Sequence, residues 1–365
     1  MKIKKLIIFF PIFNRGGLEQ VANYLLENLE FSKISVLFIT YRKNKYLNEN
    51  NKKIKIIAPT QTNKNFSNFK KLIFCTYELI KLLKKNSSKD TVILSLQNNS
   101  ISILIAKIFN YKIIIKNATP IEALLYLNNI FKTILVFFAK IITYNLANKI
   151  IVNSKSNMIS LSKFIYNKKK IKLIYNPVNL KNRKFFNKKN KKYILTVSRL
   201  VYEKGIHILI KAFKKIKKQD YKLIIVGDGV YKKKLIKLVK SLKLQKKVVF
   251  TGWINNPEKF YLNSKLFILP SFFEGFGNVL IEAMNLKVPC ISTLGSGSPK
   301  EILGNGKYGY LVQKQNVDEL TKKINYCLEN PRKIKKKAGL AKKSLARFQP
   351  AKSINKYILE INSIL

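Results

Sequence analysis

Two glutamates, Glu274 and Glu282, are separated by seven residues in a segment that could bind a hydroxyl-rich ligand. The apolar run 266–269 precedes them and predicts a buried strand, and 278–285 predicts the helix that follows. A carboxylate accepts hydrogen bonds from two neighbouring hydroxyls at once. Glu274 is therefore suited to hexose hydroxyls and Glu282 to a ribose diol. The alternative is that Glu274 only complements the helix dipole and that Glu282 pairs with a lysine.

The residues between the two glutamates form a glycine-rich turn into the helix. Gly275 and Gly277 allow the backbone to approach a ligand closely. The first N–H groups of a helix have no partner inside it, and they attract the oxygens of phosphates and sugars. Here we expect these groups to come from Phe276, Gly277, Asn278 and Val279.

A basic pair follows another predicted strand, 193–197. Arg199 lies in the turn after that strand, and Lys204 precedes Gly205 at the start of the next helix. A guanidinium makes two parallel hydrogen bonds to phosphate oxygens, and an ammonium supplies a point charge. Arg199 and Lys204 are therefore candidate phosphate ligands. Ordinary surface basicity is the alternative in a chain with 71 Lys and Arg residues.

Two further glycine turns also follow predicted strands. Gly16 and Gly17 come before a helix, which suits either phosphate binding or simply a tight turn. Gly227 begins the turn Gly227-Asp228-Gly229, which could border a nucleotide base, although any strand-to-helix turn can use such a sequence. Trp253, the only tryptophan, could also contact a base, and plain packing is its alternative role.

Short apolar runs alternate with amphipathic stretches along the whole chain. Such near-continuous runs are typical of parallel strands that are buried on both faces of a sheet. The predicted strands of the first half are 3–10, 34–40, 54–58, 91–96, 111–115, 149–153 and 171–175, and those of the second half are 193–197, 222–226, 248–250, 266–269, 290–292 and 310–312. The fold class is therefore α/β, with two Rossmann-like doubly wound domains facing a central cleft.

The domain boundaries follow from a polar segment between the two series of strands. The stretch 179–192 is polar and basic, which predicts a linker. We expect an N-terminal domain at 1–178, a C-terminal domain at 193–348, and a last helix within 349–365 that packs back on the first domain. Ligands bind beyond the carboxyl ends of the strands in such sheets, which is where the candidate residues fall.

Two apolar stretches need separate interpretation. The run 6–10 behind Lys4 and Lys5 is similar to a signal peptide, but it is short and no cleavage site follows, so we expect a buried first strand. The stretch 130–144 is interrupted by Lys132 and Lys140 and is shorter than a membrane span. It predicts a buried helix, with contact to a membrane surface as the alternative.

The charge balance is strongly basic, with 71 Lys and Arg residues against 18 Asp and Glu and a formal net charge of +53. Such a charge attracts the phosphates of nucleotides, anionic lipids or nucleic acid. Compositional drift is the leading explanation, because Lys, Asn and Ile are all abundant and AT-rich codons encode all three. No nucleic-acid-binding module is present, so no nucleic-acid partner is expected. Three scattered cysteines, Cys75, Cys290 and Cys327, predict buried free thiols in a reducing compartment.

Taken together, these motifs resemble the retaining glycosyltransferases of family 4, which have the GT-B fold. The resemblance covers nearly the whole chain, and it is strongest to bacterial enzymes that extend lipid-linked oligosaccharides or surface polysaccharides, N-acetylgalactosaminyltransferases among them. It rests on Gly16-Gly17-Leu18-Glu19, Asn176-Pro177-Val178, Ser198-Arg199 with Lys204-Gly205, Gly227-Asp228-Gly229 and the two spaced glutamates.

The resemblance implies a role for each candidate residue. Glu274, Arg199 and Lys204 would be catalytic, with the two basic residues clamping the donor diphosphate and stabilising the charge of the leaving group. Glu282 and the glycine-rich turn would bind the donor. Gly16 and Gly17, in an acceptor-binding N-terminal domain, would contact phosphate or acceptor.

The resemblance also implies the reaction and its location. A hexose or N-acetylhexosamine would move from a nucleotide sugar, with a UDP-sugar favoured, to a glycan or polyprenyl-linked acceptor. Transfer would proceed with retention and without a metal or cofactor, and the leaving diphosphate would help to deprotonate the incoming hydroxyl. The implied location is the bacterial cytoplasm, peripherally on the inner face of the cell membrane, where an anionic surface is a possible partner.

One position departs from the family pattern. Many relatives carry a histidine after the strand that corresponds to 111–115, near the transferred sugar, whereas this chain has Lys116-Asn117-Ala118. Asn117 can hydrogen-bond to a sugar hydroxyl but cannot act as a base near neutral pH. We therefore group Asn117 with Gly16 and Gly17 on the acceptor side. The one histidine, His207, is interpreted as structural.

Two other functions fit parts of the sequence. A basic protein that binds membrane or nucleic-acid surfaces without catalysis would use the charge alone and would ignore nucleotide sugars. Another GT-B enzyme, such as a nucleotide-sugar epimerase, would share the fold. It would need acid–base carboxylates in its cleft and would release product without an acceptor.

Overall fold

The chain divides into two compact units in a computed structural model that describes residues 4–12, 17–28, 34–41, 53–59, 66–126, 129–178, 180, 193–218 and 220–364. The first unit comprises Met1–Pro177 together with Pro350–Leu365, and the second comprises Val178–Gln349. The sequence placed these divisions at 178 and 348. Of the predicted linker 179–192, only Leu180 lies among the described residues.

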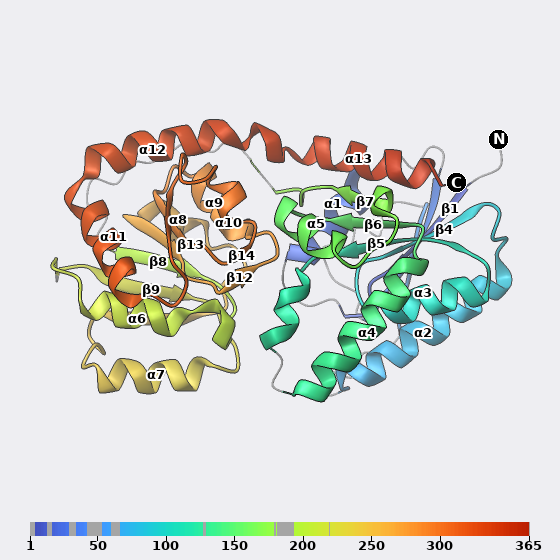
Figure 1. The fold of residues 1–365 in the computed structure, drawn as a ribbon, viewed down its shortest axis with the longest axis horizontal. Coiled ribbons are helices and arrows are strands. Elements are labelled where there is room, and N and C mark those ends of the chain that lie inside the picture. The colour runs from blue at the N-terminus through green and yellow to red at the C-terminus, as the bar shows by residue number, and fades with distance from the viewer. Residues whose placement is uncertain are drawn as a thin grey trace. The chain divides into compact units, whose positions relative to one another are not determined.

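The first unit is built on a parallel seven-stranded sheet with the order β3-β2-β1-β4-β5-β6-β7 (Figure 1). The order reverses between β1 and β4, which are neighbours although two strands separate them in sequence. The strands are β1 (Lys4–Phe9), β2 (Ile34–Ile39), β3 (Ile54–Ile57), β4 (Thr91–Ser95), β5 (Lys112–Asn117), β6 (Lys149–Val152) and β7 (Ile171–Leu173).

Helices cover both faces of this sheet. One face packs against α1 (Gly17–Asn28) and α13 (Pro350–Asn362) through an apolar cluster that includes Leu25 and Tyr357. The other face packs against α2 (Asn68–Lys85), α3 (Asn99–Ile108), α4 (Ile130–Leu146) and α5 (Lys155–Ser162). The short helices η1 (Ile121–Tyr126) and η2 (Lys168–Lys170) complete the described elements of this unit.

The second unit repeats the design with a parallel six-stranded sheet of order β10-β9-β8-β11-β13-β15. Its strands are β8 (Tyr193–Val197), β9 (Lys222–Val226), β10 (Val248–Gly252), β11 (Leu266–Leu269), β13 (Cys290–Thr293) and β15 (Tyr310–Val312). Beside it, β12 (Phe273–Glu274) and β14 (Ser296–Gly297) form a separate two-stranded pair. The helical elements are η3 (Tyr202–Lys204), α6 (Ile206–Lys214), α7 (Lys232–Ser241), α8 (Glu258–Asn263), α9 (Asn278–Asn285), α10 (Pro299–Ile302), α11 (Val317–Glu329), α12 (Pro331–Lys343) and η4 (Ser344–Phe348).

The predicted fold class, two Rossmann-like doubly wound units, is confirmed by these sheets. The apolar runs became strands because both faces of each sheet are covered, so nearly every side chain of β4 and β11 is buried. The three cysteines are free and buried, as the sequence predicted. The cleft between the two halves stays a prediction.

One prediction about a helix is wrong. The stretch 130–144 is helical, as α4, but only Thr143 and Tyr144 of this helix are buried. The sequence pattern misled because a mostly apolar run does not reveal whether its outer face is covered. Within the described residues, no helix is both long enough and apolar enough to cross a membrane.

A buried lysine anchors the last helix to the first sheet. Lys116, near the end of β5, is 1% exposed, and its Nζ donates a hydrogen bond to Tyr357 Oη at 2.6 Å. Lys149 adds a contact between its ammonium and Glu360. Burial lowers the pKa of Lys116 to about 7 and raises the pKa of Tyr357. The ammonium form of Lys116 is therefore costly in the folded protein.

We expect this cost to make stability depend on pH. Between the folded pKa of about 7 and the ordinary value of 10.5, the unfolded chain binds the proton that the folded chain has lost. Stability therefore rises with pH over that window. Relative to Lys116→Met, the wild type should gain about 2 kcal/mol between about pH 7 and about pH 9, measured by urea unfolding. Lys112→Met, at the exposed start of β5, should follow the wild type. If the free energy of unfolding changed with pH in the same way for the wild type and Lys116→Met, Lys116 would not be the source of this pH dependence.

Candidate functional site

The candidate site lies where the strand order of the second sheet reverses. Strands β8 and β11 are neighbours there, and the chain leaves them in opposite lateral directions. In open parallel sheets, ligands bind beyond the carboxyl ends of such a pair. The loop after β8 carries Arg199 and Lys204, and the loop after β11 carries Glu274. The topology therefore brings both candidate loops to one edge of the sheet.

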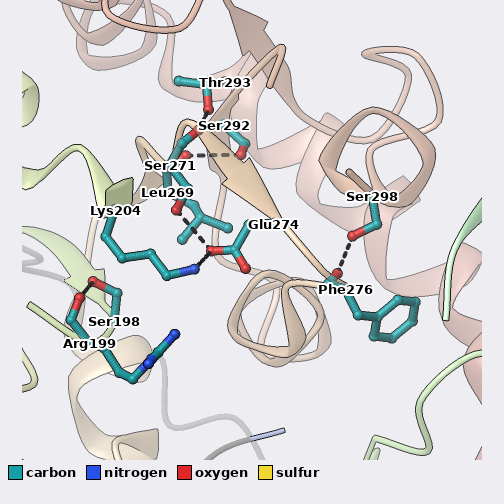
Figure 2. Close-up of polar contacts among 10 residues, drawn as sticks. All are labelled: Ser198, Arg199, Lys204, Leu269, Ser271, Glu274, Phe276, Ser292, Thr293 and Ser298. Atoms are coloured by element: carbon teal, nitrogen blue, oxygen red, sulfur yellow. Dashed lines mark hydrogen bonds and ion pairs between the residues drawn. The ribbon is translucent and has the colours of Figure 1, made fainter. Parts of the chain in front are cut away.

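Lys204 and Glu274 form an ion pair at this edge (Figure 2). Lys204 Nζ lies 2.6 Å from Glu274 Oε1, and each side chain is only 11% exposed. Ser271 Oγ donates to the same carboxylate oxygen at 2.8 Å. Glu274 Oε2 has no hydrogen-bond partner within the described part of the chain, so one carboxylate oxygen is available for a ligand. Lys204 likewise uses one of its three N–H donors on Glu274.

Close backbone packing holds the two loops together. The N–H of Phe272 donates to the carbonyl of Glu203 at 2.8 Å. Gly205 has φ of +65°, and a Cβ there would lie 2.1 Å from the carbonyl oxygen of Pro270. Only glycine tolerates both the left-handed backbone and this approach. The glycine after Lys204 therefore positions the lysine against the loop of Glu274.

A two-stranded pair fixes the backbone of Glu274. In this pair Glu274 of β12 is opposite Gly297 of β14. Gly297 has φ of +122°, and a Cβ there would lie 1.8 Å from the carbonyl oxygen of Glu274. Next to it, Ser298 Oγ donates to the carbonyl of Phe276 at 2.5 Å, and Thr293 Oγ1 donates to the carbonyl of Ser271. The glutamate is thus held on a rigid support.

Helix α9 begins directly after this support. Gly277 is its N-cap residue in a left-handed conformation, with φ of +71° and no side-chain cap. The first turn of a helix carries partial positive charge and N–H groups that suit phosphate or sugar oxygens. Phe276 is buried, while Gly275, Asn278 and Val279 are half-buried. The predicted glycine-rich turn is therefore a tight entry to a helix, next to Glu274.

Arg199 lies at the same strand end and is exposed. Its turn packs on the loop after β9, because the N–H of Leu200 donates to the carbonyl of Asp228 at 2.8 Å. Gly227 has φ of +139°, and a Cβ there would lie 1.8 Å from the carbonyl oxygen of Ser198. This contact gives Gly227 a clear role in shaping the edge. Its proposed contact with a base stays a prediction.

Two residues that were predicted to bind the nucleotide sugar form hydrogen bonds with other residues of the protein. Glu282, in the second turn of α9, accepts a hydrogen bond from Tyr261 Oη at 3.1 Å. Burial and, after it, the charge of Glu282 raise the pKa of Tyr261, which remains a hydrogen-bond donor. Trp253 is 38% exposed, and its Nε1 donates to Asn255 Oδ1 at 3.2 Å. Their roles toward a nucleotide stay predictions.

His207 belongs to an aromatic cluster beneath the site. Its ring stacks on Tyr202 with centroids 5.0 Å apart and meets Phe272 edge-on at 5.7 Å. Burial, followed by the charge of Lys211, lowers the pKa of His207, so the neutral ring is favoured. These contacts agree with the structural role expected from the sequence.

On the first unit, Asn117 is buried in a network of amides. Its Nδ2 donates to Asn157 Oδ1 and to the carbonyl of Thr119, both at 2.9 Å. Asn157 Nδ2 donates back to the carbonyl of Asn117 at 2.8 Å. Asn117 is only 4% exposed, and its side chain is occupied by these hydrogen bonds. It therefore orders the strand ends around it. Direct contact with a sugar stays a prediction.

The glycine loop after β1 is only partly described. Gly16 lies outside the described residues, whereas Gly17 is the first residue of α1. Gln97, after β4, accepts a hydrogen bond from the N–H of Ile12 in the β1 loop at 3.1 Å. The phosphate or acceptor contact of the loop stays a prediction.

Sequence reasoning did not predict the contacts of several polar residues that support the site. Ser271, Thr293 and Ser298 each fix a backbone or carboxylate group described above. The available signal was small hydroxyl residues near the carboxyl ends of β11 and β13 and directly before α10. Among the described residues, no group of three His, Cys, Asp or Glu side chains could hold a metal ion. That the reaction needs no metal stays a prediction.

Comparisons with known proteins place this site in context. Residues 178–344 match the family described as glycosyl transferases group 1. Over 370 residues, the chain is 30% identical to the N-acetylgalactosamine-N,N'-diacetylbacillosaminyl-diphospho-undecaprenol 4-alpha-N-acetylgalactosaminyltransferase of Campylobacter jejuni, covering 98% of this chain and 100% of that protein. It is 26% identical to the amylovoran biosynthesis glycosyltransferase AmsD of Erwinia amylovora, covering 97% and 98% of the two chains.

A solved structure shares the fold. Anabaena HepE, in complex with UDP and glucose, superimposes with a TM-score of 0.80 at 19% identity. The match covers 99% of this chain and 100% of that one. At this identity the likeness shows the fold alone, which is the GT-B fold with its two Rossmann-like domains.

Proposed function

Because the chain belongs to the glycosyl transferases group 1 family, we propose that it transfers an N-acetylhexosamine from a UDP-sugar to an acceptor carried on a polyprenyl diphosphate. The chain is a hexosyltransferase whose relatives build lipid-linked oligosaccharides or surface polysaccharides. The rival functions, a non-catalytic basic binder and a nucleotide-sugar epimerase, are not favoured by these relatives.

The observation that carries the proposal is the Lys204–Glu274 pair at the reversal of the second sheet. Glu274 supplies one open carboxylate oxygen for hydroxyls of the transferred sugar. Lys204 and Arg199 supply positive charge for the diphosphate, and the first turn of α9 supplies N–H groups. These groups favour a ligand that joins a sugar to a diphosphate.

In the proposed mechanism the protein orients reactants and stabilises charge. Negative charge develops on the leaving diphosphate as the bond to the anomeric carbon breaks, and Arg199 and Lys204 stabilise it. A diphosphate oxygen takes the proton from the incoming hydroxyl on the same face of the sugar, so the configuration is retained. Glu274 holds the sugar in position for this attack. A UDP donor agrees with the UDP and glucose bound to HepE.

The proposed acceptor class is supported by one relative that matches nearly the whole chain. The Campylobacter jejuni protein is named for an acceptor on undecaprenyl diphosphate. We extend this acceptor class to the present chain, with the cytoplasmic face of a bacterial membrane as the place of reaction. The large positive charge would favour both an anionic membrane surface and phosphate-bearing substrates.

A donor panel tests the proposal. UDP-N-acetylgalactosamine, UDP-N-acetylglucosamine, UDP-glucose and GDP-mannose are compared by the rise in Tm that each causes, since a ligand that binds the folded state stabilises it. A UDP-N-acetylhexosamine should give the largest rise. An equal rise with GDP-mannose would contradict the choice of donor.

We expect Arg199→Ala to weaken UDP binding by about 30-fold without altering the Tm of the unliganded protein, because Arg199 is exposed. Arg199→Lys should restore only part of the affinity, since an ammonium cannot make the paired hydrogen bonds of a guanidinium. Arg332→Ala, at an exposed position of α12, is the control and should bind UDP normally. Unchanged UDP affinity in Arg199→Ala would remove this residue from the site.

A further inference from the structure

Three neighbouring helices of the first unit expose large apolar side chains. On α4, Phe131 is 81% exposed, Leu135 is 71% exposed and Phe138 is 56% exposed. On α3, Ile108 is 77% exposed, and on α2, Phe69 is 69% exposed. Soluble proteins seldom expose contiguous apolar areas unless something binds there. The surface therefore needs a partner.

The spacing of these side chains puts each set on one face of its helix. Phe131, Leu135, Phe138 and Ile142 of α4 follow steps of four, three and four residues, which line up along a helix. The exposed residues of α2 and α3 repeat in the same way. The opposite faces of all three helices pack on one core cluster. The exposed stripes therefore all point away from the sheet.

The stripes join into one surface, which we call the apolar surface of α2, α3 and α4. Helix α3 contacts α4 on one side and α2 on the other (Figure 1). Helix η1, which contacts α4, adds Leu125 at 77% exposed. Because α4 lies between the parallel strands β5 and β6, its first residues are near the carboxyl ends of the strands. The apolar surface thus extends to the edge where such a domain binds its ligand.

Lysines accompany the apolar side chains. The three helices carry eight lysines and one acidic residue, Glu78. Helix α4 itself carries Lys132 and Lys140 and no acidic residue. An apolar face combined with basic residues is the pattern of helices that lie in the headgroup region of an anionic bilayer.

We propose that the apolar surface of α2, α3 and α4 docks on an anionic lipid bilayer, with the axes of the helices along the membrane plane. Phe131, Leu135 and Phe138 enter the boundary between headgroups and acyl chains, and the lysines bind lipid phosphates. The charge complementarity favours a bilayer over a second copy of this chain, whose own surface would bring equal lysines together. Only the purpose of docking rests on the proposed function: docking would bring the strand ends of the first unit to an acceptor anchored in the membrane.

Vesicle co-sedimentation tests the proposal with the full chain. The probes are vesicles of equal parts phosphatidylcholine and phosphatidylglycerol, with phosphatidylcholine alone for comparison. The test variant is Phe131→Ser/Leu135→Ser/Phe138→Ser. The control variant Val249→Ser/Leu340→Ser/Leu359→Ser removes three exposed apolar side chains outside the surface. Because all six positions are solvent-exposed, both variants should fold, as their Tm values will report.

The test variant should partition onto the mixed vesicles about 100-fold less than the wild type, while the control variant partitions normally. The wild type should bind phosphatidylcholine alone much more weakly than the mixture. Rises in Tm with UDP should be equal for all three proteins, since the second unit is intact. Equal vesicle binding by the test variant and the wild type would overturn the proposal.

Two further outcomes separate this proposal from its alternatives. If light scattering shows a wild-type dimer that the test variant loses, with vesicle binding unchanged, the surface binds a second copy and the proposal is overturned. The variant Glu274→Gln should bind vesicles normally. In the wild type, normal vesicle binding together with no transfer from any nucleotide sugar would reject the proposed reaction and support the docking surface.

Discussion

Glu274→Gln should lower kcat/KM for sugar transfer by about 10²–10³-fold. Glutamine keeps the size of the side chain and can still accept hydrogen bonds from Lys204 and Ser271, so the fold should persist. It loses the charge that holds Lys204 at 2.6 Å and the second carboxylate oxygen that the sugar needs. The measurement is initial-rate kinetics with the donor chosen by the panel, alongside the Tm.

The control is Glu329→Gln, which also removes a carboxylate near a lysine. Glu329 Oε1 lies 4.0 Å from Lys217 Nζ, and its side chain is 46% exposed, so this pair contributes little. Its kinetics should match the wild type. Near-normal turnover in Glu274→Gln would remove Glu274 from the catalytic site.

A double-mutant cycle shows whether the pair acts as one unit. We compare Glu274→Gln, Lys204→Gln and the double variant. If each side chain positions the other, the second substitution should lower kcat/KM much less in the single variant than it does in the wild-type background. Fully additive losses in transition-state stabilisation would instead indicate two independent contributions.

Gly297→Ala should reduce both stability and activity. Its φ of +122° disfavours any side chain, and a Cβ would lie 1.8 Å from the carbonyl oxygen of Glu274. The strand β14 must move to relieve this contact, and β12 moves with it. We expect a loss of about 3 kcal/mol in the free energy of unfolding. Displacement of Glu274 should lower kcat by about 100-fold or more.

The matched control is Gly339→Ala in helix α12. A Cβ at Gly339 meets nothing within 4 Å. Alanine is the better helix former, so this variant should be about 0.5–1 kcal/mol more stable and fully active. Urea unfolding and initial rates check both variants. A Gly297→Ala protein with wild-type kinetics would show that the β12–β14 pair does not position the glutamate.

The fold could be predicted from the sequence because local and global signals agree. Strands β8, β9, β11 and β15 have the predicted limits, since each is a short, mostly apolar run that is followed by a polar or turn-forming residue. Helix α3 was not singled out among the expected helices, because 99–108 is mostly apolar and resembles a strand as much as a helix. Whether the outer face of α4 is covered depends on its neighbours, which a pattern along one segment does not report.

The site was predictable as a set of residues but not as a set of contacts. Lys204 and Glu274 were predicted as site residues because each follows a predicted strand, and the order of the strands in the sheet brings them together. Their ion pair depends on Gly205 and Gly297, whose close approach to distant carbonyl groups has no local signature. The contacts of Asn117 were also not predictable, because its amide partner Asn157 is 40 positions away in the sequence.

The return of α13 to the first unit affects how the chain can assemble. Ile354, Tyr357 and Ile361 complete a core whose other buried members precede residue 175, so this core joins two segments that lie far apart in the sequence. During synthesis, the first unit must wait for residues 350–364 to leave the ribosome, whereas residues 178–349 leave it earlier. Expression of 1–177 alone would therefore expose the apolar surface that Ile354, Tyr357 and Ile361 cover in the whole chain.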